Sequence, residues 1–513
     1  MSVINIQFDR HAAWLDGSES QRAIEILDSE FWYEPRGARI TEEKFRQKLR
    51  YRFAKLPAEV AKKKIREILD KYDPTVKLVD LGDKSFPPGL VRRAERILIA
   101  AGFETVIGDQ FGNSDKEFVR GYPINFEPRP HQIASQESSH ILFKYRLMVK
   151  RMATGAGKTF DACMTIASLG LPTMFVVPSK LLLEQAYEDF AYFFGSDKIG
   201  RLGAGYHEEA LIQIATLQSI GNCLPKKKKA NNTKEDGIER QKKRYERVVK
   251  TKLLIIDEVH RIPADDFYET AFAFDNAEYV LGYTATDRRI DGATLKIEAA
   301  AGYTGYTILA PSLINDGFLV PPLIYFDPIP ARQLPFMREK TRVDFFRDYN
   351  LFSKHQIIEN EQNHEIIAGL ADREAANRKF TLIAINKVEH GKGIYDKIKH
   401  DCALVTSQTP KAWEKIKDFR NGEYPILIST LCAEGFNAPC IDNLIIAQDS
   451  TDSEQIVGRG LRLNEGKSVC HVHHTFARIP DDKIWSAARY MVNHAEKCRE
   501  IYRELEYPIM KDL

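Results

Sequence analysis

Met152-Ala-Thr-Gly-Ala-Gly-Lys-Thr159 is the stretch that decides the interpretation of this chain. Two glycines, Gly155 and Gly157, let the backbone turn tightly and point consecutive N–H groups at one place. Residues 160–169 carry apolar side chains at helical spacing, so the positive end of a helix dipole would face the same place. Lys158 would reach the β- and γ-phosphates of a nucleotide, and Thr159 would hold Mg²⁺ through its hydroxyl. The stretch predicts a loop that binds ATP with Thr154, Gly155, Ala156, Gly157, Lys158 and Thr159.

The stretch departs from the strict phosphate-loop pattern at one position. The pattern GxxxxGK(S/T) requires glycine at 152, where this chain has Met. The preceding residues 145–150 fit either a strand or the end of a helix. A glycine-rich turn that happens to precede Lys-Thr is the alternative, and the residues downstream decide between the two.

Length and charge limit the fold and the kind of partner. A chain of 513 residues is too long for one core and suggests about three domains. A hydrophobic content of 43% and a charged content of 28% are typical of globular proteins. The net charge is only +2, so any nucleic-acid surface has to come from local basic patches.

The cysteine pattern and the lack of a recognisable targeting signal predict that this protein works in a reducing cytoplasm. None of the seven cysteines forms a CxxC pair, which argues against a zinc ribbon, an iron–sulfur cluster or a disulfide framework. His471-Val-His473-His474 lacks a cysteine or carboxylate at ligand spacing, so we expect a strand with exposed histidines. The sequence shows neither a signal peptide nor an apolar run long enough for a membrane. We therefore expect no membrane association and a cytoplasmic location, in the host if the chain is phage-encoded.

Residues 1–118 are expected to form a small N-terminal α+β domain that binds DNA. Ile4, Ile6 and Phe8 alternate with polar residues as in a strand, and residues 12–15 are its predicted hairpin partner. Residues 76–81 predict another strand, and Phe86-Pro-Pro-Gly-Leu-Val91 a turn before an amphipathic helix over 92–101.

A basic segment lies inside this first region. Residues 42–71 contain eleven Lys or Arg against five acidic residues, with Tyr51 and Phe53 among them. Basic and aromatic residues together favour a nucleic-acid surface. A solvated helix whose arginines cover its apolar side explains the same pattern, and the sequence does not separate the two.

The next region, residues 119–315, carries the phosphate loop. Gly112-Asn-Ser-Asp115 is the predicted linker into it, and Gln132 stands where its amide could recognise adenine at N6 and N7. Strands are predicted over 173–178, 211–216 and 279–282. An insertion begins at Pro225-Lys-Lys-Lys-Lys229; it predicts either a charged loop leading into a helix or an additional contact with phosphates.

Leu253-Leu-Ile-Ile256 runs directly into Asp257-Glu258-Val-His260. An apolar parallel strand that ends in two carboxylates places both at the carboxyl edge of the sheet, where the phosphate loop also lies. Asp257 would hold Mg²⁺ through its water shell, and Glu258 would orient and deprotonate the attacking water. Two carboxylates in this position are rarely structural, because burying them unpaired is costly.

A second parallel α/β sheet is predicted over residues 316–513, after a proline-rich crossing at 311–322. Its strands are predicted at 323–326, 381–385, 403–405, 426–428 and 444–447, and a helix over 482–506 closes the chain. This region has no phosphate loop of its own. Gln455-Ile-Val-Gly-Arg459-Gly-Leu-Arg462 places two arginines on one helix face, where they would meet the γ-phosphate across a cleft. A surface helix with ordinary salt bridges is the alternative.

Taken in order, Gln132, Lys158, Asp257, Thr284 and Arg459 resemble the motifs of superfamily 2 helicases over residues 127–470. Such helicases have two RecA-like parallel α/β domains. Asp257-Glu-Val-His-Arg-Ile-Pro-Ala264 and Gly282-Tyr-Thr-Ala-Thr-Asp-Arg-Arg-Ile-Asp-Gly292 are similar to the XPB/UvsW-like branch, as is Asn386-Lys-Val-Glu-His390-Gly-Lys392.

The resemblance also implies roles for individual residues. His260, Thr284, Thr286 and Gln455 would couple the ATP site to the nucleic-acid track. The residues that would line this track are Pro178, Ser179, Thr216, Asn386 and Thr430. Gly435 would lie near the ribose, although the family usually has Asp where this chain has Asn437. Where the branch has the triplet Arg-Glu-Asp, this chain has Arg289-Ile-Asp291.

The resemblance implies an ATP-dependent DNA helicase or translocase that remodels branched or duplex DNA in recombination, repair or fork processing. The expected cofactors are ATP and Mg²⁺. The expected partners are branched, duplex or single-stranded DNA and single-strand-binding or recombination proteins, with a monomeric motor. Three alternatives stay open: an RNA helicase, the duplex translocase of a restriction or defence complex, and a nucleotide-switched binding protein.

Overall fold

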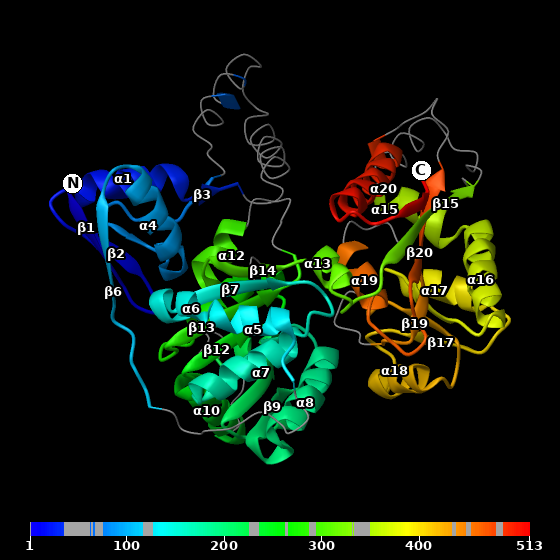
Figure 1. The fold of residues 1–513 in the computed structure, drawn as a ribbon, viewed down its shortest axis with the longest axis horizontal. Helices are drawn as coiled ribbons and strands as arrows, with labels where there is room; N and C mark the ends of the chain where they lie inside the picture. The colour runs from blue at the N-terminus through cyan, green and yellow to red at the C-terminus, as the bar shows by residue number, and fades with distance from the viewer. Residues whose placement is uncertain are drawn as a thin grey trace. The chain divides into compact units, whose positions relative to one another are not determined.

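A computed structural model describes residues 2–34, 62, 65–66, 75–115, 127–224, 235–261, 265–286, 294–330, 332, 349–432, 438–447, 453–478 and 486–512. The chain divides into two compact units (Figure 1). The first comprises Met1–Arg151, Thr159–Pro178 and Tyr187–Thr307, and the second comprises Met152–Lys158, Ser179–Ala186 and Ile308–Leu513. The three-domain boundaries expected at 118 and 315 stay predictions.

The first unit begins with a four-stranded sheet whose buried face carries Ile4, Ile6 and Phe8. Strand β1 (Val3–Phe8) pairs antiparallel with β2 (Ala13–Asp16) and parallel with β6 (Glu104–Asp109). The strand order is β5-β2-β1-β6, with β5 at Ser85–Phe86. Helices α1 (Ser20–Glu30) and α4 (Val91–Ala100) pack against this sheet. This confirms the predicted first strand and its hairpin partner.

The strand predicted over 76–81 is shorter than expected. Strand β4 covers only Val76–Lys77 and pairs with β3 (Trp32–Tyr33). The reason lies at Asp80, whose Oδ1 accepts the N–H groups of Gly82 and Asp83 at 2.9 and 3.1 Å. The chain therefore turns at 80–83, and Asp80 forms only an isolated β-bridge with Ser85. The predicted turn before the next helix is confirmed, because η1 (Pro88–Leu90) leads directly into α4.

The N-terminal sheet belongs to the first unit because η1 and α4 pack against α12 (Thr294–Ala301) and the nearby Tyr303. A Cβ atom at Gly89 would lie 1.9 Å from the carbonyl oxygen of Glu298, so only glycine allows this approach. Arg93 donates two hydrogen bonds of 2.7 Å to the Glu298 carboxylate. Arg92 lies 4.8 Å from the ring centroid of Tyr303. The interface thus combines a close backbone approach at Gly89 with an ion pair between Arg93 and Glu298.

An eight-stranded, mostly parallel sheet forms the larger part of the first unit (Figure 1). Its strand order is β10-β9-β11-β8-β12-β13-β7-β14. The strands are β7 (Leu147–Met152), β8 (Thr173–Val177), β9 (Ile199–Gly203), β10 (Tyr206–His207), β11 (Ile212–Thr216), β12 (Leu253–Ile256), β13 (Tyr279–Thr284) and β14 (Thr304–Ile308). Strands β8, β11 and β12 are buried along their whole length, as parallel strands covered on both faces must be.

Helices connect these strands. They are α5 (Pro130–Glu137), α6 (Ser139–Tyr145), α7 (Lys158–Leu169), α8 (Lys180–Phe194), α9 (Leu217–Gly221), α10 (Glu235–Lys250), α11 (Asp265–Phe272) and α12. The predicted strands over 173–178, 211–216, 253–256 and 279–282 are confirmed. The helix expected after the lysine run is α10, whereas Lys226 and Lys229 themselves lie outside the described residues.

A second sheet forms the centre of the second unit (Figure 1). It has seven strands in the order β17-β18-β16-β19-β20-β15-β21. Its strands are β15 (Pro322–Pro330), β16 (Phe380–Ala384), β17 (Cys402–Val405), β18 (Ile426–Ser429), β19 (Ile441–Ile446), β20 (Cys470–Arg478) and β21 (Ile509–Lys511). All registered pairs are parallel. Helices α16 (Glu361–Ala376) and α17 (Val388–Tyr395) pack on it, with Ile367, Ile394 and Ile428 in the core between them. The predicted α/β class with parallel sheets is confirmed.

Two details of the second unit differ from the sequence prediction. Residues 311–322 contain most of a short helix, α13 (Ala310–Asn315), because Pro311 fits the first turn of a helix. The last helix, α20, begins at Ser486 and ends at Glu504, and β21 follows it. None of the helices in the described part of the chain is long and apolar enough to cross a membrane.

The histidines of β20 form a strand as predicted, but the prediction that they are exposed is wrong. His473 and His474 are only 8% and 3% exposed. The Nδ1 atom of His473 lies 2.6 Å from Oδ2 of Asp327, and that of His474 lies 3.1 Å from the Tyr502 hydroxyl. The sequence could not show this, because both partners are distant along the chain.

All seven cysteines lie among the described residues and are free. Burial raises the pKa of the Cys432 and Cys470 thiols to about 12, so neither forms a thiolate at neutral pH.

Candidate nucleotide and nucleic-acid site

The predicted phosphate loop connects β7 to α7. Helix α6 ends at Tyr145 and β7 starts at Leu147, which settles the two alternatives for this segment in favour of a strand. Gly155 and Gly157 have φ angles of +88° and +82°, which favour glycine over any residue with a Cβ atom. Lys158 is the first residue of the twelve-residue helix α7, and Thr159 is the second. This backbone fits a polyphosphate, because N–H groups at a helix N-terminus attract anions.

The two carboxylates follow the carboxyl end of β12. Asp257 donates its N–H to the carbonyl of Val176 at 2.9 Å, and its Oδ1 accepts the N–H of Glu258 at 2.9 Å. Glu258 has a φ of +49°, in the left-handed region that non-glycine residues rarely occupy. Such strained backbone is concentrated at functional sites. Strands β7, β13 and β12 are parallel neighbours, so their following segments leave the sheet at the same edge.

His260 contacts both Glu258 and Thr284, the last residue of β13. Its Nδ1 lies 3.4 Å from Oε2 of Glu258 and 3.1 Å from Oγ1 of Thr284. The Thr284 hydroxyl donates to the carbonyl of Thr286 at 2.5 Å and accepts the Thr286 N–H at 3.2 Å. Because the single hydroxyl proton of Thr284 is used in this way, we infer that the proton between the two side chains is on Nδ1 of His260. The structure thus brings together the three coupling residues predicted in this unit.

Gln132 lies in the first turn of α5 and is buried. Its Oε1 accepts the N–H of Arg129 at 2.9 Å, as in a capping box. This hydrogen bond fixes the orientation of the amide. Recognition of adenine by Gln132 stays a prediction.

The residues predicted to line the nucleic-acid track follow strand ends in both sheets. Pro178 follows β8, and Thr216 ends the neighbouring strand β11, with Oγ1 2.7 Å from Ser219 Oγ. Ser179, next to Pro178, accepts the N–H of Leu182 at 3.4 Å. In the second sheet the exposed Asn386 and the half-buried Thr430 follow the adjacent parallel strands β16 and β18. Several other predicted positions lie outside the described residues, namely Gly435, Asn437 and the triplet at 289–291.

The prediction that Arg459 and Arg462 share one helix face is wrong. Helix α19 (Ser453–Gly460) contains Gln455 and Arg459, both buried, whereas Arg462 lies beyond it and pairs with Leu319 in an isolated β-bridge. The helix ends at Gly460, whose carbonyl accepts a hydrogen bond of 2.5 Å from Nζ of Lys467. Arg459 is therefore not on an ordinary surface helix, which was the alternative interpretation.

Lys467 is a residue that sequence reasoning missed. Its Nζ also donates to the carbonyl of Pro439 at 3.3 Å, and burial lowers the pKa of this amine. The lysine therefore holds the segment that carries Arg462 against the chain before β19. A lone lysine in a turn has no pattern that would have revealed this role.

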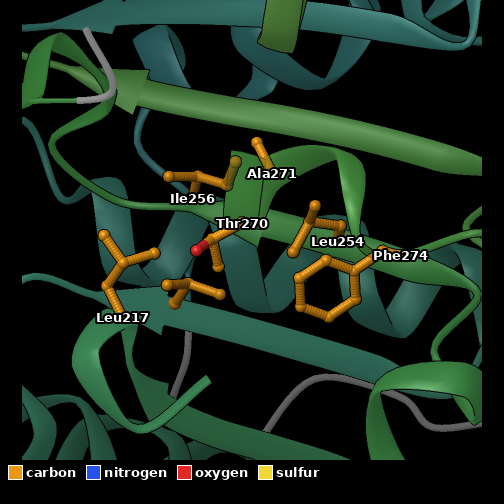
Figure 2. A pocket seen from close by; sticks show the side chains of 7 residues that line it. Leu217, Leu254, Ile256, Thr270, Ala271 and Phe274 are labelled. Carbon is orange, nitrogen blue, oxygen red and sulfur yellow. The ribbon is translucent and has the colours of Figure 1, made fainter. Parts of the chain in front are cut away.

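An apolar cavity under α11 is separate from this chemistry (Figure 2). Its lining residues are Val176, Leu217, Leu254, Ile256, Thr270, Ala271 and Phe274. The cavity volume is about 10 Å³, near the minimum that holds one water molecule. It is a packing gap in the core and too small for a nucleotide.

Comparison with known proteins supports the motif assignment. A family profile described as "Type III restriction enzyme, res subunit" matches residues 125–289. The "Putative DNA 3'-5' helicase Rad25" of Halobacterium salinarum is 24% identical over 346 residues, which cover 66% of this chain and 53% of the relative. The "DNA 3'-5' translocase XPB2" of Sulfurisphaera tokodaii is 25% identical over 335 residues, 56% of this chain and 68% of the relative.

A solved structure shares the fold. The ATP-dependent Type ISP restriction-modification enzyme LlaBIII bound to DNA aligns with a TM-score of 0.51 at 14% identity, over 78% of this chain and 32% of that chain. This chain spans about half the length of the first two curated relatives that match it. The motifs and these matches together support the resemblance that the sequence predicted, to superfamily 2 helicases of the XPB/UvsW-like branch.

Proposed function

We propose that this chain is an ATP-dependent DNA helicase or translocase that remodels branched or duplex DNA in recombination, repair or replication-fork processing. The observation that supports it most strongly is the pair of contacts that His260 makes, an ion-pair contact of 3.4 Å with Glu258 and a hydrogen bond of 3.1 Å with Thr284. A motor needs its hydrolytic carboxylate to sense the segment that responds to nucleic acid. A protein that only binds nucleotide has no need for such a connection.

The ATP site follows from the backbone described above. The N–H groups around Gly155 and Gly157 would bind the phosphates, and Lys158 would contact the β- and γ-phosphates. Thr159 and Asp257 would hold Mg²⁺, which, when bound, neutralises charge on the phosphates. Glu258 would accept the proton of the attacking water. The roles predicted for Gln455, Arg459 and Arg462 stay part of this proposal.

The substrate class is proposed from the names of the relatives, which specify DNA helicases and translocases. The experiment is a steady-state ATPase assay of the purified chain with a fork, a four-way junction, plain duplex, single-stranded DNA and RNA at one fixed salt concentration. The proposal expects multiple turnovers, with greater stimulation by DNA than by RNA. Equal or greater stimulation by RNA would favour an RNA helicase, and a single turnover would favour a nucleotide-switched binding protein.

A second candidate function is the duplex translocase of a restriction or defence complex. The family profile over residues 125–289 and the likeness to LlaBIII favour it. A translocase of this kind would displace a third strand from a triplex but leave the two strands of a duplex paired. A helicase would release the strand of a partial duplex, so the two displacement assays separate these functions.

A further inference from the structure

Three side chains of the first unit form a fully buried network behind the candidate site. Lys150 on β7, Asp161 on α7 and Tyr283 on β13 are each at most 1% exposed. Nζ of Lys150 donates to Oδ2 of Asp161 at 2.9 Å, and the Tyr283 hydroxyl donates to the same oxygen at 2.6 Å. Nε2 of Gln136, on α5, donates to Oδ1 of Asp161 at 2.9 Å. Four elements therefore meet at one carboxylate.

Stability alone does not account for these charged groups. A lysine in the middle of a buried parallel strand replaces an apolar residue that would pack without desolvation. Burial lowers the pKa of Lys150 while Asp161 opposes that shift, so the ammonium depends on its partner. Replacing a buried ion pair by apolar residues of similar size is often neutral or stabilising. The network therefore contributes something other than net stability.

The positions of the three residues indicate what that contribution is. Lys150 lies on β7 two residues before Met152, where the phosphate-loop stretch starts, and Asp161 is in the first turn of α7, after Lys158. Tyr283 directly precedes Thr284, and successive side chains of a strand point to opposite faces. Tyr283 thus contacts α7 on one face of β13, while Thr284 contacts His260 on the other.

We infer that Asp161 is a positioning residue, which through Tyr283 holds the Thr284–Thr286 segment in register with α7 and so makes ATP hydrolysis responsive to nucleic acid. This inference rests on the proposed function. A hydrogen bond to a charged group inside a protein is strong, so its loss shifts the alignment of β13 against α7. Binding of ATP would be little affected, because Asp161 does not belong to the loop.

Tyr283→Phe tests the inference, because it removes only the hydroxyl and leaves Asp161 bonded to Lys150 and Gln136. The expected result is a KM for ATP within about two-fold of wild type and a DNA stimulation of ATPase that falls about ten-fold, as the loss of one charge-assisted hydrogen bond predicts. Tyr306→Phe is the matched control. Its hydroxyl donates to the carbonyl of His131 at 2.7 Å in the same unit, and its stimulation should stay at the wild-type level.

A purely structural role would give a different outcome. Tyr283→Phe would then lower the melting temperature but leave the ratio of DNA-stimulated to basal rate unchanged, which overturns the inference. The triple variant Lys150→Met, Asp161→Leu, Tyr283→Phe extends the test, since it should fold while losing stimulation; a stimulated triple variant also overturns it. Absence of any ATPase in the wild-type chain would instead refute the proposed function.

Discussion

Arg93 and Glu298 are joined by two parallel hydrogen bonds of 2.7 Å, which connect the N-terminal sheet to helix α12 of the first unit. The Arg96 guanidinium also donates to the Tyr303 hydroxyl at 2.8 Å, beside the same helix. Further along, Arg146 on the α6–β7 connection contacts Asp109 at 3.1 Å. These contacts attach the N-terminal residues to the unit whose strand β7 leads into the phosphate loop.

This docking predicts a specific effect of Gly89→Ala. The new Cβ atom would lie 1.9 Å from the backbone oxygen of Glu298, so η1 has to withdraw from α12. We expect a destabilisation of about 1–3 kcal/mol, as for other overpacked interfaces, and faster hydrogen exchange in both η1 and α12. Gly369→Ala is the control, since it has no neighbouring atom within 4 Å and lies in helix α16. Unchanged exchange in Gly89→Ala would show that the docking does not persist in solution.

Neutralising basic residues in the segment 44–71 should weaken DNA binding while basal ATPase is retained. Substitution is preferable to deletion of residues 1–118, because deletion would uncover Tyr303 and α12. Replacing Lys44, Arg46, Lys48 and Arg50 by Gln should reduce the slope of log K against log salt by about 0.9 for each DNA phosphate that the segment no longer neutralises. An affinity and slope identical to wild type would mean that this segment is only solvated.

His390 predicts a pH dependence in the second unit. Burial, followed by the neighbouring His364, lowers the pKa of His390 from 6.5 to about 3. Below pH 6.5 the imidazole of His390 binds a proton in the unfolded chain but stays neutral in the folded chain. The free energy of unfolding therefore falls by about 1.4 kcal/mol per pH unit between pH 6.5 and 3.

Urea unfolding at pH 7 and pH 5 measures this effect. Replacing Trp14 and Trp32 by Phe leaves tryptophans only in the second unit. His390→Gln should then show a weaker loss of stability on acidification than the parent chain. Equal losses in both would assign the pH dependence to other groups.

Glu258→Gln should separate ATP binding from hydrolysis. The amide keeps the shape of the side chain but cannot accept the proton of the attacking water, so turnover should fall by about 10²–10⁴-fold. Calorimetric titration with ATP and Mg²⁺ should give nearly wild-type affinity. Failure to bind ATP would instead make Glu258 a structural or metal-holding residue.

Local patterns predicted much of the fold and the nucleotide motifs. The alternation at Ile4, Ile6 and Phe8 and the apolar run 253–256 are set by short-range periodicity, and both strands were predicted correctly. The phosphate-loop turn also depends on local residue types, which is why the positive φ angles at Gly155 and Gly157 agree with it.

Pairings between residues distant in sequence could not be predicted. Asp161 and Tyr283 are 122 residues apart, so no local pattern joins them. The burial of His473 depends on Asp327, 146 residues away. Arg462 was misplaced because helical spacing does not reveal where a helix ends, and the cap from Lys467 is made through space.

The rate of ATP hydrolysis by wild-type protein and by Lys158→Ala, with and without duplex DNA, tests the central claim most directly. We predict many turnovers per wild-type molecule, faster with DNA, and a rate near background for Lys158→Ala. The circular dichroism spectra of the two proteins should be the same, because the role of Lys158 is to bind phosphate and not to stabilise the fold. A folded Lys158→Ala protein that hydrolyses ATP at the wild-type rate, or a wild-type protein that never turns over ATP, would contradict the claim.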